Sequence, residues 1–186
     1  MAVSTGKTRE GFTVRVLHAP APLTETPAAR YVWAITRLAL GWVFAWAFLD
    51  KTFGLGHETP AARAWIDGGS PTTGFLENSP EGPFAGLYND LAGQTWADWL
   101  FMIGLAGIGT ALILGIAMRI AAGAGALLLV LMWTAVLPPE NNPFMDDHLI
   151  YAMVLIGLAL VSAGTTLGLG KWWNDTALVR RYPVLK

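Results

Sequence analysis

Four long apolar stretches dominate the pattern of hydrophobic and polar positions along the chain. They cover about residues 31–49, 99–118, 120–137 and 149–169. Each is close to the roughly 20 apolar residues that a helix needs to cross a bilayer. Only the first contains a charged residue, Arg37. The pattern therefore predicts an all-α integral membrane protein built as a four-transmembrane-helix bundle.

Basic and acidic residues are divided unequally between the connecting segments. Residues 1–30, Arg119 and residues 170–186 hold nine of the twelve Lys and Arg residues and only three of the thirteen acids. Segments 50–98 and 138–148 hold the other ten acids and two bases. Because cytoplasmic segments are enriched in Lys and Arg, we expect a multi-pass protein of the plasma (inner) membrane with both termini in the cytoplasm.

Three parts follow from this topology. Residues 1–30 form a cytoplasmic N-terminal tail, residues 31–169 form the membrane domain, and residues 170–186 form a cytoplasmic C-terminal tail. The membrane domain includes the long outer loop 50–98. Arg119 leaves little room between the second and third stretches, so they are predicted to form a tight hairpin.

The outer loop is too long for a simple connection, because structureless loops beyond about 15 residues are uncommon. A proline at its start and two glycines after its end predict a short helix over 61–66. Apolar residues at i, i+3, i+4 and i+7 predict an amphipathic helix over 84–91. We expect a helical extracytoplasmic cap. It covers the helix ends, or it forms a lid or a surface over 52–98 on which another protein subunit docks.

The composition narrows the chemistry. Hydrophobic residues make up 54% and charged residues 13% of the 186 residues, about half the charged share of a typical soluble domain. This apolar composition is typical of a protein that lies in the lipid bilayer. The net charge of −1 gives no basic surplus for binding nucleic acid. The absence of cysteine excludes iron–sulfur clusters and zinc held by cysteine. Only three histidines occur, none at i, i+4 spacing, so neither haem nor a metal centre is expected.

The first apolar stretch carries candidate functional residues. An ionisable residue inside a span, here Arg37, is by default a hypothesis for a functional site. Its alternative is structural, either as a buried pair or as a side chain that reaches back to the interface. Trp46, Asp50 and Lys51 lie near the outer end of the same stretch. They are candidates for binding a cofactor, or they are ordinary interfacial residues.

The segment 138–148 gathers three acids, two amides and one histidine next to Tyr151. A quinone needs an apolar slot, hydrogen-bond partners for its carbonyls and a protonatable group with access to water. Histidine suits this role because it gains and loses a proton near neutral pH. His148 with Asp147, facing Trp46 and Asp50, would fit such a slot, with Tyr151 as a further contact. The alternative is helix capping by Asp147 and a surface histidine.

The chain resembles the DoxX/DoxD-like membrane family over roughly residues 33–175. The resemblance rests on the motif from Arg37 to Phe44 with Lys51 after it, on the glycine-rich segment 107–119, on 142–151, and on the glycines of 164–170. Size and the long outer loop are closer to the DoxD branch, the large membrane subunit of thiosulfate:quinone oxidoreductase. The resemblance implies a four-helix bundle, a quinone as electron acceptor and a small partner subunit.

Two functions remain in competition. The first is a quinone-linked oxidoreductase subunit in which Arg37 and Lys51 supply fixed positive charge while His148 and Asp147 move protons. The second is a non-catalytic accessory or assembly subunit of a larger membrane complex of the respiratory type. The outer loops hold ten acids against two bases, a field that disfavours a dianion such as thiosulfate. A transporter is disfavoured because the sequence shows no pair of broken helices.

Overall fold

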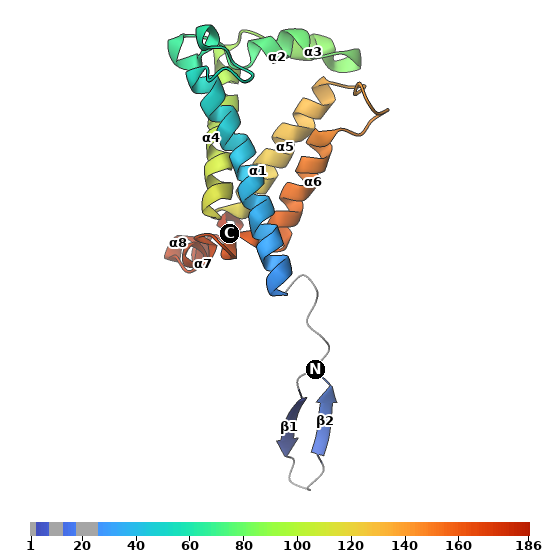
Figure 1. Cartoon of the computed structure of the whole chain (residues 1–186), viewed down its shortest axis with the longest axis vertical. Helices are drawn as coiled ribbons and strands as arrows, with labels where there is room; N and C mark the ends of the chain where they lie inside the picture. The colour runs from blue at the N-terminus through green and yellow to red at the C-terminus, as the bar shows by residue number, and fades with distance from the viewer. Residues whose placement is uncertain (1–2, 8–12, 18–25) are drawn as a thin grey trace.

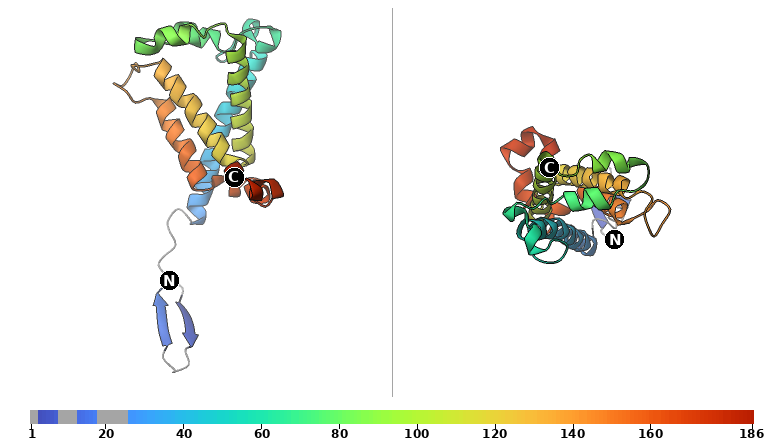
Figure 2. Two further views of the ribbon diagram at one scale, coloured as in Figure 1. Left: turned by 180° about the vertical axis from the view of Figure 1, so that it is seen from behind. Right: turned by 90° about the horizontal axis from the view of Figure 1, so that it is seen from above.

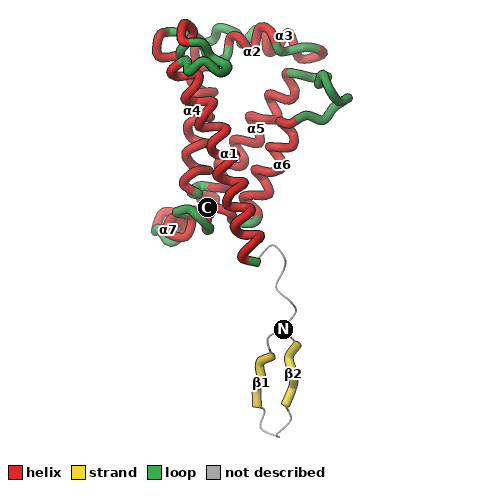
Figure 3. Tube along the Cα trace, in the orientation of Figure 1, coloured by secondary structure: helices red, strands yellow, loops and turns green. Residues whose placement is uncertain are grey.

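The computed structural model describes residues 3–7, 13–17 and 26–186 (Figure 1). Strands β1 (Val3–Lys7) and β2 (Thr13–Leu17) pair antiparallel, with Val3 opposite Leu17. This hairpin lies within the predicted N-terminal tail, for which the sequence suggested no strand. From residue 26 onward the described chain is helical, as expected (Figure 3).

Among the described residues, three helices are long and apolar enough to cross a membrane. They are α1 (Pro27–Phe53), α4 (Thr95–Leu114) and α5 (Met118–Ala135). Helix α1 begins four residues before the predicted stretch, because Thr26 caps it through a bond from the Ala29 amide and Pro27 occupies its first position. It ends at Gly54, whose φ of 61° takes the left-handed conformation typical of a helix end.

The turn between α4 and α5 is as tight as expected but lies earlier than Arg119. Gly115 and Ala117 both adopt left-handed conformations, with φ of 72° and 48°. Arg119 then falls in the first turn of α5. Its backbone amide and its guanidinium donate to the carbonyls of Lys186 and Pro183 at the C-terminal end of the chain, at 2.8 and 3.1 Å.

The fourth apolar stretch differs from its prediction. Helix α6 (Asp147–Leu160) has 14 residues and stops well before residue 169. Ser162 and Leu167 have φ of 52° and 50°, and a single 3₁₀ turn covers Ala163–Thr165. The predicted continuous helix over 149–169 is therefore wrong in its second half. A contact between distant parts of the chain explains the difference, because carbonyls of this segment accept hydrogen bonds from the Arg37 side chain of α1.

The four main helices pack as two pairs, α1 with α4 and α5 with α6 (Figures 1 and 2). The pairs meet at the end where α1 begins, here named the lower end, and diverge toward the end where α1 finishes, the upper end (Figure 1). Glycines permit the contacts within pairs. A Cβ on Gly109 would lie 2.8 Å from the Ala45 amide nitrogen, and one on Gly125 would lie 2.7 Å from a methyl of Leu155.

A layer of short helices crosses the upper end (Figure 1). It contains 3₁₀ turns at Ala61–Arg63, Trp65–Asp67 and Gly82–Phe84, and the helices α2 (Thr73–Asn78) and α3 (Ala85–Asn89). The predicted helix over 61–66 is two 3₁₀ turns, the one over 84–91 is shorter, and α2 lies between them, where the sequence analysis predicted no helix. Tyr88 ties the layer to α5, donating to the Leu131 carbonyl at 2.9 Å.

The lower end carries the C-terminal residues. Helices α7 (Gly170–Asn174) and α8 (Ala177–Arg181) lie beside the start of α5, followed by a 3₁₀ turn at Pro183–Leu185. Val179 is fully buried. The Trp173 indole donates to the Leu185 carbonyl at 2.6 Å. The predicted C-terminal tail is thus folded onto the helical body.

Candidate functional site

Arg37 is fully buried in the interior of the protein. Its Nη1 donates to the carbonyls of Leu112 and Ile113, where α4 ends, the second bond measuring 2.9 Å. Its Nη2 donates to the carbonyls of Thr166 and Leu167 at 3.3 and 2.7 Å. The guanidinium is enclosed by backbone carbonyls and forms no ion pair among the described residues, so its geometry gives it a structural role. Its Nε has no partner among the described residues.

Four glycines make room for this guanidinium. A Cβ on Gly115 would lie 3.1 Å from Nη1 of Arg37, and one on Gly168 would lie 3.1 Å from Nη2. Cβ atoms on Gly164 and Gly170 would lie within 2.3 and 2.6 Å of backbone atoms. Larger residues at these positions would therefore push the two carbonyl-bearing segments away from the charge they surround.

Asp50 is 2% exposed near the upper end of α1. Its carboxylate accepts bonds from the backbone amides of His57, Glu58 and Thr59 at 3.2, 3.1 and 2.9 Å. The carboxylate thus holds the loop that follows α1. Lys51 contacts the exposed Glu58 at 4.0 Å.

Three aromatic rings pack against one another near the upper end of α1. The ring of Trp46 packs edge-on against His57, with centroids 4.9 Å apart, and Trp42 stacks 5.8 Å from Trp46. His57 had no assigned place in the sequence analysis. A histidine in a loop gives no signal for this contact, because the Asp50 carboxylate folds the loop back onto the helix.

His148 lies in the first turn of α6, with its side chain 21% exposed. Its Nδ1 is 2.6 Å from Oδ2 of Asp146. Asp147, the predicted partner, lies 3.7 Å from the same nitrogen and is mostly exposed. This distance is that of a hydrogen bond between the imidazole and the carboxylate. Nε2 is left without a hydrogen bond in the described part of the chain.

Asp146 has a second role as the N-cap of α6, because its Oδ1 accepts from the Leu149 amide at 3.2 Å. The ligand atoms of Asp146, Asp147 and His148 lie within 4.8 Å of one another. They could offer three groups to a cation. However, both oxygens of Asp146 already have partners, the Leu149 amide and the His148 ring. Tyr151 lies one turn further along α6 and is exposed.

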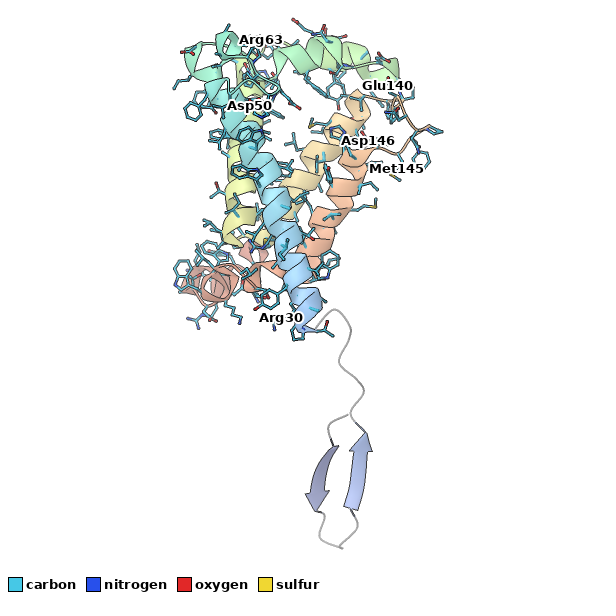
Figure 4. All side chains as sticks on the ribbon, in the orientation of Figure 1. Arg30, Asp50, Arg63, Glu140, Met145 and Asp146 are labelled. Atoms are coloured by element: carbon cyan, nitrogen blue, oxygen red, sulfur yellow. The ribbon has the colours of Figure 1, made fainter. Side chains whose placement is uncertain are left out.

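The structure separates the sequence-predicted residues into three places. Asp50 and its neighbours Trp46 and Lys51 lie at the top of α1, and Arg37 lies about 20 Å further down the same helix. Asp146 lies on the other helix pair (Figure 4). Within residues 26–186 no hydrogen bond or ion pair joins the Asp50 region to the Asp146–His148 region.

Asp98 is an anchor that the sequence analysis did not identify. Instead of capping α4, its buried carboxylate accepts bonds from the hydroxyls of Ser70 and Thr72 and from the Thr72 amide, at 2.8, 2.6 and 3.1 Å. It holds the upper layer on α4. No sequence signal marks this contact, since the partners are 26 and 28 residues away.

Comparison with known proteins adds no relative, because no protein-family model, curated protein or solved structure matches the chain.

Proposed function

We propose that the chain is a multi-pass membrane subunit of the DoxX/DoxD type that binds a quinone near the upper end of α6 and exchanges protons with it through His148. The observation that carries the proposal is the His148–Asp146 pair, at 2.6 Å. Asp146 fixes the tautomer and the orientation of the ring. With the proton of the neutral ring on Nδ1, Nε2 can accept a proton from a quinol. To serve a quinone, Nε2 first takes a proton from water, and the resulting imidazolium delivers it to the quinone oxygen.

In this proposal the fourth crossing consists of α6 and the segment 161–169. Fourteen helical residues span about 21 Å, less than the roughly 30 Å of hydrocarbon. The irregular segment completes the crossing, and Arg37 satisfies two of its carbonyls at Thr166 and Leu167. Non-helical backbone at membrane depth is tolerated where it is buried in protein in this way.

The upper end faces away from the cytoplasm in the proposal. It carries ten of the thirteen acids, and the basic residues gather at the lower end and in the N-terminal tail. Reduction of a quinone takes up two electrons and two protons. The chain has no cysteine to hold an iron–sulfur cluster, so we assign the electron donor to a partner subunit. His148 handles the protons.

The test begins with protein extracted in mild detergent and with mass spectrometry of its organic extract. The proposal expects near-stoichiometric quinone and, in membranes containing the partner, loss of quinone reduction in His148→Gln. Asp146→Asn keeps a capping side chain and should lower the rate about tenfold to a hundredfold. Glu140→Gln serves as the control and should keep its activity, because Glu140 is an exposed acid in the loop before α6. Absence of quinone, or full activity of His148→Gln, would overturn the proposal.

One observation favours the accessory function as a second candidate. Ile66, Phe84 and Leu87 in the upper layer are exposed apolar side chains, which suit docking of another subunit. In this case a native gel of the mild extract would show a larger complex without bound quinone. Replacing Leu87 with Glu would release the chain from that complex, and recovery only as a lone stable species would argue against docking.

A further inference from the structure

A cavity of about 330 Å³ opens at the lower end, between the first turns of α1 and the segment that follows α6. Its lining includes Arg30 and Trp33 from α1, and Ser162, Thr165 and Thr166 from the irregular segment. Arg30 and Ser162 are exposed, so the cavity is accessible from outside. Figure 4 shows Arg30 at the lower end of α1. The lining is rich in hydrogen-bond donors and contains no acid.

Two guanidinium groups converge on one residue of this lining. Nε and Nη2 of Arg30 donate to the hydroxyl of Thr166, both at 3.3 Å. Nη2 of Arg37 donates to the backbone carbonyl of the same Thr166 at 3.3 Å. Across residues 26–186 neither arginine forms an ion pair with a carboxylate. The buried Nε of Arg37 also lacks a partner among these residues. Among the described residues, the positive charge of these two arginines is therefore not paired with an acid.

This charge and the hydroxyls match the needs of a phosphate group, which accepts charge-assisted hydrogen bonds from guanidinium. The long bonds from Arg30 to Thr166 join a strong donor to a weak neutral acceptor, so an anion in the cavity would compete for the donor effectively. Buried positive charge in a medium of low dielectric also increases the attraction for an anion.

The surroundings of the cavity point to a lipid as the source of the phosphate. Apolar side chains beside the cavity are exposed, with Leu160 at 80%. Tyr31 and Ile35 on α1 are exposed as well. In a membrane Leu160 and Ile35 would contact acyl chains, while Arg30, Tyr31 and Trp33 would lie at the level of the headgroups. A lipid can thus place its phosphate in the cavity and its chains along the helices.

We propose that this cavity binds the phosphate group of an anionic membrane lipid. Such lipids are concentrated in the leaflet that faces the cytoplasm, the side to which the basic lower end is assigned. The site depends on the protein lying in a membrane but not on the proposed quinone chemistry. Its role is to anchor the start of α1 to the irregular segment through a ligand that both contact.

The test uses purified full-length protein in a nonionic detergent and native mass spectrometry. Dioleoyl phosphatidylglycerol is added in one arm and dioleoyl phosphatidylcholine in the other, and the fraction of protein that retains one lipid is measured. We expect retention of phosphatidylglycerol. Arg30→Gln should reduce it about fivefold, the effect of one basic residue near the surface. Arg30→Lys keeps the charge and should retain most of the binding.

Arg180→Gln is the matched control, because Arg180 is an exposed lower-end residue outside the cavity lining. It should bind phosphatidylglycerol like the unmodified protein. Equal losses in Arg30→Gln and Arg180→Gln would overturn the site, as would equal retention of both lipids. A third arm adds inorganic phosphate. Displacement of the lipid by an equal concentration of phosphate would identify a free-anion site and overturn the assignment to a lipid.

Discussion

Arg37 on α1 donates a 2.7 Å hydrogen bond to the backbone carbonyl of Leu167, in the segment that follows α6. The two residues are 130 positions apart. The same guanidinium holds the end of α4, so one buried side chain joins three parts of the lower end. In the sequence, Arg37 was the charged residue that most suggested a functional role. In the structure it holds the lower end together, because it donates to carbonyls of the irregular segment that have no partner within a helix.

Replacing Arg37 with Met should destabilise the protein, because four backbone carbonyls lose a charged donor. We expect a loss of roughly 2–4 kcal/mol, measured as a lower midpoint of thermal unfolding in detergent. Arg180→Gln is the control, since Arg180 is exposed and its loss should shift the midpoint little. An unchanged midpoint in Arg37→Met would contradict the assigned role.

Gly109 and Gly107 lie on the same helix and give a matched pair. A Cβ at Gly109 would approach the backbone of Ala45 at 2.8 Å, whereas one at Gly107 would have no neighbour within 4 Å. Gly109→Ala should lower stability by roughly 1–3 kcal/mol because α1 and α4 must separate. Gly107→Ala should leave stability unchanged or raise it slightly. Similar unfolding midpoints for the two variants would refute the close α1–α4 contact.

Asp50→Ala removes the acceptor for three successive amides of the loop after α1. Hydrogen exchange at His57, Glu58 and Thr59 should become about tenfold faster or more, as measured by peptide mass spectrometry. Asp67→Ala, an exposed acid in the same layer, should leave exchange of these amides unchanged. If both variants exchange alike, the carboxylate does not hold the loop.

The absence of cysteine makes the chain suited to a direct test of topology. Gly86 and Arg180 are exposed at the upper and lower ends, and nothing lies near a Cβ at Gly86. A membrane-impermeant maleimide should label Gly86→Cys in intact cells and label Arg180→Cys only after permeabilisation. The reverse pattern would invert the proposed orientation.

The sequence predicted helices well where local signals decide them. Three apolar stretches became α1, α4 and α5, although α1 and α4 end at Gly54 and Gly115 rather than at the predicted residues 49 and 118. It failed at 161–169, where hydropathy alone is typical of a continuing helix. There the partners that stabilise a non-helical backbone come from Arg37, more than 120 residues away. Local patterns carry no information about such a partner.

In the candidate site, too, local sequence signals identified some residues, whereas contacts between distant segments could not be predicted. His148 was found because a histidine beside acids at a helix start is visible in the sequence. The sequence did not show whether Asp146 or Asp147 contacts His148, since this depends on which carboxylate the first helical turn directs toward the ring. The roles of His57 and Asp98 could not be predicted from the sequence either. Each depends on a fold of the upper layer that brings a distant backbone to the side chain.

The bonds of Arg37 also set an order of events during synthesis. The chain emerges from its N-terminus, so in the proposed membrane topology α1 is made with its charged side chain before either set of carbonyls exists. The acceptors at Leu112 and Ile113 come with α4, and those at Thr166 and Leu167 come only after α6 has been made. Until residues 161–170 have been made, a helix α1 lying in the bilayer would hold a buried charge without two of its four carbonyl partners, an arrangement that the bilayer disfavours.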